Sequence, residues 1–396
     1  MTGAEDGGAR LVALRGRVVT DYEVWPEGSV LFEGGAILDV SPDDSLLEDA
    51  DEAHELPDSL LVPGFVDAQV NGAFGVDVAS EPHRVPELSE ALLATGTTAY
   101  LPTVISSPQS LYEEVLPALS QVTGERRRGA EVLGVHLEGP FISLDKRGAH
   151  AAAHVVPPDA GLLGRLLDLG PVRMITVAPE LEGAGEIMDL AVRRGVAVSA
   201  GHSDAPFEVA YEAFDGWASG VTHLFNAMSA MHHREPGLPG AAFAHPRVVC
   251  GLIADGLHVH PEIVGLAFRM LGPDRVSLVT DSIAAAGMGD GECRLATRTV
   301  YMDGGVPRLA TGAIAGSVLT MNEAFRNALA FTSCTIPEAV RMTSTAPARL
   351  IGEGRRKGRI TPGYDADVTA LAPDLSVEAV WRCGEKVYEP AGRGTG

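Results

Sequence analysis

The chain has 396 residues, 45% of them hydrophobic, and a formal net charge of −23 at pH 7. This length is enough for one large buried core and a smaller one. The acidic balance argues against a nucleic-acid partner, because a phosphate backbone needs a basic surface. The four cysteines are widely spaced and form no CxxC pair, so reduced thiols in a cytoplasmic protein are expected. No apolar run predicts a membrane span, and the acidic, glycine-rich start is not a signal peptide.

The chain begins with a β-rich segment. Residues 1–9 are expected to be disordered, and β-like runs follow at 11–19, 30–33 and 36–40. The Gly34-Gly35 link between the last two runs predicts a tight hairpin. A further stretch at 54–61 leads to a break at Pro63-Gly64. This opening segment therefore belongs to a β structure that precedes the main domain.

From residue 65 onwards, apolar β-branched runs alternate with helical patterns. The predicted strands are residues 65–70, 98–104, 132–138, 174–178, 196–202, 221–224, 249–254 and 276–281. Helices are predicted at 86–94, 109–122, 159–169, 185–194, 206–214 and 261–271, and an irregular link is expected between the sixth and seventh strands. This alternation predicts an α/β fold with a (β/α)8 TIM-like barrel. A doubly wound open sheet is the structural alternative.

The last third of the chain returns to β structure. A hairpin is predicted at about residues 293–310, turning at 303–305, and helices are predicted at 321–330 and 336–344. The tail is β-like, so β segments flank the barrel on both sides. We expect them to pair into one small discontinuous β-sandwich domain. The predicted division assigns residues 1–62 and 359–396 to this small domain and 63–358 to the barrel.

Four polar side chains fall at the carboxyl ends of predicted barrel strands, where chemistry is found in such barrels. They are Glu138, His202, His223 and Asp281. One carboxylate and two imidazoles can form an open zinc site with water in the fourth position. Zinc lowers the pKa of that water to about 7, and Asp281 suits the role of its general base.

Each of these residues also has a structural interpretation when taken alone. A lone histidine at a strand end is more often a hydrogen-bonded structural residue, and we interpret His136 in this way. Glu138 could be a buried ion-pair partner, and Asp281 could cap the turn that follows it. The joint occurrence of the four residues at one end of the barrel favours a metal-dependent hydrolase.

Eight motifs carry a resemblance to a known family. In chain order they are LVPGFVDAQVNG, GVHLEGPFI, GHSDA, THLFNAM, REPGLPG, IADGLHV, TDSIAAAG and GRITPGYDADV. Together they resemble the amidohydrolase superfamily and, within it, the N-acetylglucosamine-6-phosphate deacetylase family. The resemblance implies a barrel with a small β-sandwich domain, and a homodimer. It also implies hydrolysis of the N-acetyl group of an amino-sugar phosphate, giving glucosamine 6-phosphate and acetate in amino-sugar catabolism.

Matching positions imply roles for individual residues. Glu138, His202 and His223 would bind the metal, and Asp281 would be the catalytic acid/base. His150 would polarise the acetyl carbonyl, with His154 as its alternative. The implied substrate contacts are Ala149, His150, Asn226, Ala227, Arg234, Asp255, Gly256, Leu257, His258, Ile314, Ala315 and Gly316. The planar guanidinium of Arg234 suits the phosphate, and in the family this arginine sometimes comes from the neighbouring subunit. The alternative is that Arg234 forms a surface or interface ion pair. His232 and His233 are interpreted as surface or rim residues.

Gln69-Val70-Asn71 stands where many amidohydrolases carry His-x-His for a second metal. Amides are weak zinc ligands, so we expect one divalent ion, zinc, with iron, cobalt or another first-row metal as alternatives. N-acetylgalactosamine 6-phosphate or another amidohydrolase substrate remains an alternative substrate. A non-catalytic binding protein on this fold is the alternative of another class.

Overall fold

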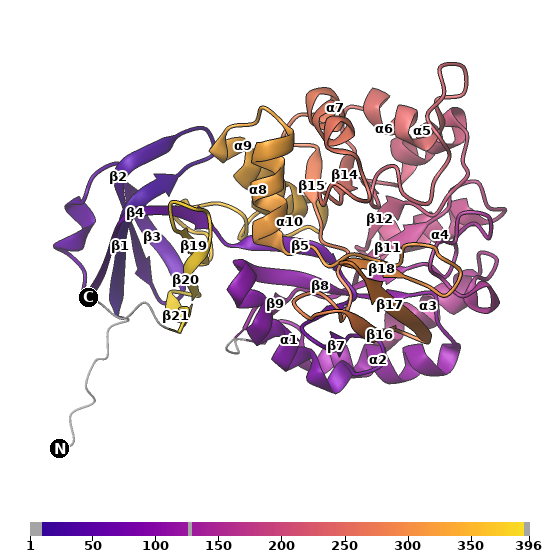
Figure 1. Ribbon diagram of the computed structural model, residues 1–396, viewed down its shortest axis with the longest axis horizontal. Helices are drawn as coiled ribbons and strands as arrows, with labels where there is room; N and C mark the ends of the chain where they lie inside the picture. Colours follow the sequence, from indigo (N-terminus) through magenta and orange to yellow (C-terminus); the bar gives the residue numbers. More distant parts are fainter. Residues whose placement is uncertain (1–9, 126–128, 392–396) are drawn as a thin grey trace.

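The computed structural model describes residues 10–125 and 129–391, so the disorder expected at residues 1–9 lies outside the described chain. Two large sheets organise the molecule, one at each end of its long axis (Figure 1). Helices surround the larger, parallel sheet. Strands from both ends of the chain, coloured indigo and yellow, build the other sheet.

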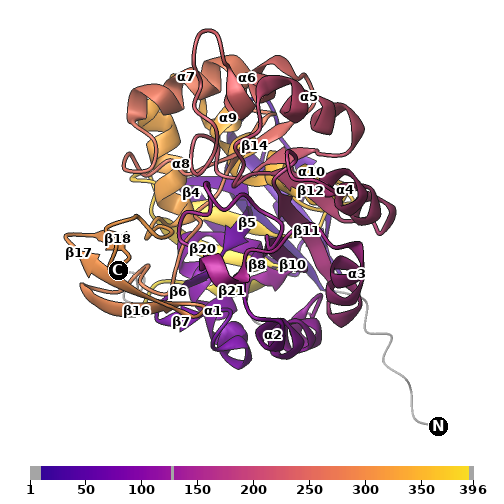
Figure 2. The same ribbon diagram turned by 90° about the vertical axis from the view of Figure 1, so that its right-hand side faces the viewer.

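The parallel sheet contains eight strands that follow one another in chain order. They are β5 (Phe65–Val70), β8 (Thr97–Ile105), β10 (Val135–Glu138), β11 (Val172–Val177), β12 (Ala197–Ala200), β13 (Gly220–Val221), β14 (Val249–Leu252) and β15 (Val276–Leu278), with β9 (Glu131–Val132) paired to β8. The first and last strands meet where the backbone N–H of Asp281 donates to the carbonyl of Gln69 at 2.9 Å and Val70 bridges Ser282. The sheet thus nearly closes into the predicted barrel, and the open-sheet alternative is wrong (Figure 2).

Helices form the outer ring of the barrel in Figure 2. They are α1 (Val85–Leu92), α2 (Gln109–Val122), α3 (Ala160–Leu169), α4 (Ala184–Arg193), α5 (Phe207–Gly216), α6 (Gly237–Ala244), α7 (Pro261–Leu271), α8 (Met321–Phe331), α9 (Ile336–Val340) and α10 (Ala346–Leu350). The predicted bounds of α2 and α7 are confirmed. The link expected to be irregular before the seventh strand is irregular over residues 222–236, but α6 follows it and was not predicted. The sequence GLPGAAFA of α6 is almost wholly apolar and gives no amphipathic signal.

The second sheet joins the two ends of the chain, as predicted. Its order is β21-β20-β19-β4-β1-β2-β3. The strands are β1 (Leu11–Val19), β2 (Val24–Glu33), β3 (Ala36–Ser41), β4 (Glu52–Pro63), β19 (Val368–Leu371), β20 (Val377–Arg382) and β21 (Glu385–Tyr388). The hairpin at Gly34-Gly35 is confirmed, with Glu33 opposite Ala36. This sheet has its own core, which includes Leu14, Phe32 and Trp381. The exact domain boundaries stay a prediction.

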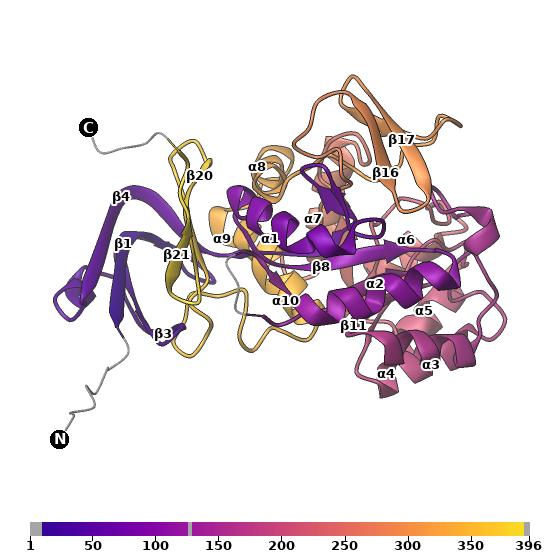
Figure 3. The ribbon, with the colours of Figure 1, turned by 90° about the horizontal axis from the view of Figure 1, so that it is seen from below.

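A third, three-stranded sheet projects sideways from the barrel, at the upper right of Figure 3, and is separate from the small domain at the left. It consists of β16 (Gly291–Leu295), β17 (Arg298–Asp303) and β18 (Val306–Arg308). The predicted turn at 303–305 is confirmed, with Asp303 opposite Val306. The predicted hairpin had two strands, whereas a further turn at Ala296 divides the segment into three. A short pair, β6 (Gly72–Ala73) and β7 (Val76–Asp77), follows β5.

A buried charge cluster links the barrel to the small domain. The ammonium of Lys357 lies 2.6 Å from Glu131, 2.9 Å from Asp365 and 2.5 Å from Asp367, and the lysine side chain is 1% exposed. The three carboxylates could otherwise be taken for a metal site, since their oxygens lie within 4.8 Å of one another. Because Lys357 already supplies the positive charge, we interpret the cluster as structural.

Over the ranges that the structure describes, no helix is long and apolar enough to cross a membrane.

Candidate active site

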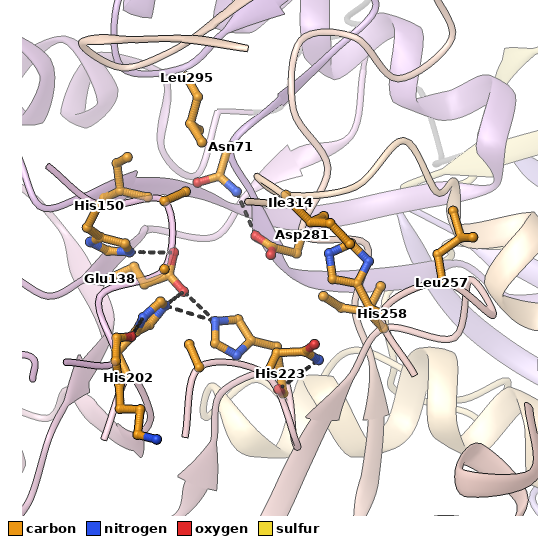
Figure 4. Close-up of a pocket in the computed structure, with 18 of the residues that line it drawn as sticks. Asn71, Glu138, His150, His202, His223, Leu257, His258, Asp281, Leu295 and Ile314 are labelled. Atoms are coloured by element: carbon orange, nitrogen blue, oxygen red, sulfur yellow. Dashed lines mark hydrogen bonds and ion pairs between the residues drawn. The ribbon is translucent and has the colours of Figure 1, made fainter. Parts of the chain in front are cut away.

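The four residues predicted at the strand ends meet at the mouth of the barrel (Figure 4). Glu138 is the last residue of β10, and the other three follow β12, β13 and β15. His202, His223 and Asp281 have φ angles of 48°, 31° and 49°. This left-handed conformation is costly for non-glycine residues and is concentrated at functional sites. It turns the chain sharply where each strand ends, and all four side chains are buried.

Glu138, His202 and His223 bring three metal-ligand atoms together. Glu138 Oε1 lies 3.2 Å from His202 Nε2 and 3.0 Å from His223 Nε2, and the two Nε2 atoms are 3.0 Å apart. His202 Nδ1 lies 2.8 Å from the carbonyl oxygen of Lys146, which can only accept, so the proton is on Nδ1. The lone pair of Nε2 is therefore free for a metal. This donor set fits zinc or another first-row divalent ion.

The charges of these residues also suit a cation. Burial and the nearby His150 lower the pKa of His202 to about 4, so its imidazole is neutral. Burial favours the protonated form of Glu138, but its contacts with the surrounding histidines, with that of His150 the largest, outweigh burial and hold the pKa of Glu138 well below the ordinary value. Burial likewise lowers the pKa of His223, but the bond to Glu138 outweighs it and raises the pKa. A metal must therefore compete with a proton at His223.

Two side-chain amides from the end of β5 hold the carboxylates in place. Gln69 Nε2 donates to Glu138 Oε1 at 2.9 Å and to Asp281 Oδ1 at 3.1 Å, and Asn71 Nδ2 donates to Asp281 Oδ1 at 2.7 Å. Burial and the charge of Glu138 raise the pKa of Asp281 to about 7. A carboxyl group with such a pKa can accept and return a proton near neutral pH.

His150 has its tautomer fixed by the neighbouring loop. The backbone N–H of Ser106 donates to His150 Nδ1 at 3.2 Å, and the Ser106 hydroxyl lies 2.8 Å from the same nitrogen. The neutral imidazole therefore carries its proton on Nε2, which lies 3.7 Å from Glu138 Oε2. A fixed N–H donor beside the carboxylate and the imidazoles can stabilise a developing oxyanion. His154, the alternative in sequence, does not line the pocket.

These groups line a cavity of about 360 Å³. Eight of the predicted substrate contacts line it: Ala149, His150, Asn226, Ala227, Leu257, His258, Ile314 and Gly316. Ala315 is fully buried, and Gly256 is absent from the lining. Asp255 lines a neighbouring cavity, and its carboxylate binds His258 Nδ1 at 2.7 Å. The lining residues that sequence reasoning missed as substrate contacts include Ile105, Asp145, Lys146, Gly148, Ile253 and Leu295.

The structure also shows where Arg234, the expected phosphate contact, and His136, interpreted as a structural residue, are placed. Arg234 is exposed, lies outside the cavity lining and contacts His233 Nε2 at 2.9 Å. His136 is fully buried, and its Nε2 lies 2.8 Å from the Thr176 hydroxyl, which in turn lies 2.7 Å from that of Thr222. This hydroxyl network supports the structural interpretation of His136, which stays a prediction.

The barrel fold and the candidate metal site are typical of a metal-dependent hydrolase. Residues 60–387 match the model of the amidohydrolase family, and the chain belongs to this metal-dependent family of enzymes. Bovine N-acetylglucosamine-6-phosphate deacetylase is 37% identical over 393 residues, covering 95% of this chain and 94% of the relative. N-acetylgalactosamine-6-phosphate deacetylase of Escherichia coli O157:H7 is 37% identical over 329 residues, covering 82% and 87%. A variant N-acetyl-D-glucosamine-6-phosphate deacetylase of Mycobacterium smegmatis, in complex with N-acetyl-D-glucosamine-6-phosphate, matches with a TM-score of 0.89 and 34% identity, covering 96% and 99%.

Proposed function

We propose that this enzyme hydrolyses the N-acetyl amide of N-acetyl-D-glucosamine 6-phosphate, giving glucosamine 6-phosphate and acetate. The observation that carries the proposal is the 37% identity to the bovine deacetylase over 95% of the chain. The site chemistry agrees, because amide hydrolysis needs a water-activating centre, a proton acceptor and an oxyanion donor. Glu138, His202 and His223 with Asp281 and His150 supply these parts.

Glu138, His202 and His223 would hold a single divalent ion, for which zinc is the first candidate and iron or cobalt are alternatives. A divalent ion bound there supplies Lewis-acid chemistry, which makes water acidic and favours negative charge on the amide oxygen. The single-ion proposal rests on Gln69 and Asn71, whose N–H groups face carboxylates and carry no lone pair for a second ion.

Asp281 would move the proton. Its Oδ1 atom is held by Asn71 and Gln69, so the second carboxylate oxygen is left to accept a proton from the attacking water. With a pKa of about 7, Asp281 can then pass that proton to the leaving nitrogen as the C–N bond breaks. The nitrogen leaves as an amine and the acyl group as acetate, so no covalent enzyme intermediate is needed.

His150 would bind the amide oxygen. Because Nδ1 accepts from Ser106, the Nε2–H bond is available to donate to the carbonyl oxygen as negative charge develops there. This fixed donor needs no reorganisation during the reaction, which is the condition under which such a hydrogen bond lowers a barrier most.

The sugar phosphate would lie against Ala149, Asn226, Ala227 and the 255–258 and 314–316 segments, of which most line the cavity. In a homodimer, Arg234 would pair with the phosphate of a substrate bound in the neighbouring subunit, since Arg234 is exposed and lies outside the lining of its own cavity. An exposed apolar stripe on α7 supports a homodimer: Ile263, Leu266 and Met270 are 36%, 47% and 58% exposed.

The remaining expectations are proposed on narrower grounds. The division into residues 1–62 with 359–396 and 63–358 is supported by the separate sheets. A cytoplasmic location is supported by the four cysteines, all of which are free thiols. The second candidate substrate is N-acetylgalactosamine 6-phosphate, which the name of the Escherichia coli relative favours.

An acetate-release assay tests the proposal. The purified enzyme is offered N-acetylglucosamine 6-phosphate, its galactosamine epimer and unphosphorylated N-acetylglucosamine at equal concentrations. The first substrate should show the highest kcat/KM. A preference for the epimer would move the function to the second candidate, and no acetate from any of the three would overturn the deacetylase proposal.

A further inference from the structure

The outer three-stranded sheet reaches the active site through one side chain. Gly291, Glu292 and Arg294 of β16 are exposed, whereas Leu295 at the end of the strand is 3% exposed. Of the described residues of this sheet, Leu295 alone lines the catalytic cavity. A mostly solvent-exposed sheet thus buries one apolar side chain over the site.

A buried carboxylate fixes the turn that carries Leu295. The backbone N–H of Ala296 lies 3.2 and 3.1 Å from the two carboxylate oxygens of Asp77. Asp77 is 1% exposed and also accepts the backbone N–H and hydroxyl of Ser80, at 2.8 and 2.7 Å. A charged acceptor strengthens these bonds. Since Ala296 has a φ of 50°, the turn is held in one particular conformation.

The other edge of the sheet is tied to the cavity wall. The backbone N–H of Ala315 donates to the carbonyl of Pro307 at 3.1 Å, and Arg308 bridges Ile314, which lines the cavity. The sheet is therefore fastened at both of its edges, so Leu295 is held in place over the site.

Leu295 lies at the other end of the cavity from His258 and Leu257, two of the proposed sugar contacts. In Figure 4 it stands beyond Asn71 on the side of His150, whereas His258 and Leu257 lie on the other side of the catalytic residues. If the sugar phosphate takes the His258 side and the amide carbon lies between His150 and Asp281, the acyl chain points towards Leu295. Ile105, 4% exposed and next in sequence to the Ser106 that holds His150, adds a second apolar wall.

We propose that Leu295 is a specificity-determining residue that closes the acyl end of the cavity and restricts the substrate to short N-acyl groups such as acetyl. The inference rests on the proposed deacetylase function. The reaction is the same amide hydrolysis, with a longer carboxylate leaving in place of acetate. In a tight apolar pocket one methylene group changes kcat/KM by roughly 10–200-fold, so the chain length of the acyl group is a sensitive probe.

The test compares kcat/KM for the N-acetyl, N-propionyl and N-butyryl derivatives of glucosamine 6-phosphate. We expect the wild-type enzyme to prefer acetyl over butyryl by at least about tenfold, and Leu295→Ala to raise the butyryl-to-acetyl ratio by at least about tenfold. Tyr301→Ala is the matched control, since Tyr301 lies on the same sheet, is 42% exposed and does not line the cavity. Its ratio should equal that of the wild type.

Three results would overturn the inference. The first is a butyryl-to-acetyl ratio of kcat/KM in Leu295→Ala that stays within about twofold of the wild-type ratio. The second is an equal loss of activity on all three acyl groups in this variant. The third is a wild-type enzyme that hydrolyses the butyryl derivative as well as the acetyl one. Leu295→Val, which removes less volume, keeps the test valid if the alanine variant does not fold, and it should raise the propionyl-to-acetyl ratio. A wild-type enzyme inactive on the N-acetyl substrate overturns the proposed function itself. Normal acetyl turnover with unchanged ratios overturns only the role of Leu295.

Discussion

Asp281→Asn removes the proposed proton carrier and leaves the rest of the site intact. Asparagine has the same shape, and its side-chain oxygen can still accept from Asn71 Nδ2 and Gln69 Nε2, which lie 2.7 and 3.1 Å from Asp281 Oδ1. No metal-ligand atom of Glu138, His202 or His223 is changed. We therefore expect a folded protein that binds the metal and the sugar phosphate normally but lacks a group that can take up the proton.

The expected loss follows from the role of the proton. Positioned acid–base groups contribute roughly 10²–10⁴-fold, so kcat for acetate release should fall by that factor. At about 1.4 kcal/mol per tenfold, this is about 3–5 kcal/mol of transition-state stabilisation. KM should change much less, because Asp281 acts on the proton and the other lining residues bind the sugar. Acetate release, metal content and substrate binding by calorimetry measure the three quantities separately.

Asp67→Asn is the matched control. Asp67 is also buried at the end of the barrel seam, where it accepts the Thr280 hydroxyl at 2.6 Å, but it does not line the cavity. Its variant should lose stability and keep kcat within about tenfold of wild type. A near-normal kcat in Asp281→Asn, with the metal still bound, would refute the proton-carrier role.

Other predictions concern the charge cluster and the phosphate. Lys357→Met should lower the free energy of urea unfolding by about 3–5 kcal/mol, since it leaves buried carboxylates without their positively charged partner. Lys386→Met, which breaks an exposed ion pair, should cost less than about 1 kcal/mol, and equal costs would contradict the reasoning. Burial raises the pKa of Glu131, but Arg356 and Lys357 outweigh it and hold the pKa at about 2, below its ordinary 4.5. The stability that Glu131 adds, about 3 kcal/mol, should therefore be complete above about pH 5 and lost as the pH falls towards 2. The difference in free energy of urea unfolding between wild type and Glu131→Gln must then become smaller between pH 7 and pH 3. Arg234→Ala should raise KM for the phosphorylated substrate by roughly tenfold or more and leave the unphosphorylated one unchanged, whereas equal losses would disprove a phosphate contact.

The barrel and the four strand-end residues could be predicted because they depend on local patterns. Each predicted strand is an apolar run, and parallel strands all end at the same rim. The bounds were less accurate where the chain leaves the sheet early. Residues 221–224 were predicted as a strand, but only Gly220–Val221 pair, because His223 adopts a positive φ. That turn is what directs the imidazole towards Glu138, and no pattern of residue types predicts it.

Contacts between distant residues could not be predicted from the sequence. Lys357 and Glu131 are far apart in the chain, and nothing near either residue indicates a partner. Leu295 is one of several apolar residues in the predicted hairpin and nothing in the sequence distinguishes it, so its burial over the site depends on where Asp77 holds the turn. Gln69 and Asn71 were singled out as poor metal ligands. The structure adds that their amides bind the carboxylates of Glu138 and Asp281.

The most direct measurement is acetate release from N-acetylglucosamine 6-phosphate by enzyme that has been treated with a chelator and then titrated with zinc. Activity should disappear with the metal and return at about one equivalent of zinc per chain, because Glu138, His202 and His223 form one ligand set and Gln69 and Asn71 offer no second. Full activity in metal-free enzyme, or recovery that needs about two equivalents, would contradict a one-metal deacetylase.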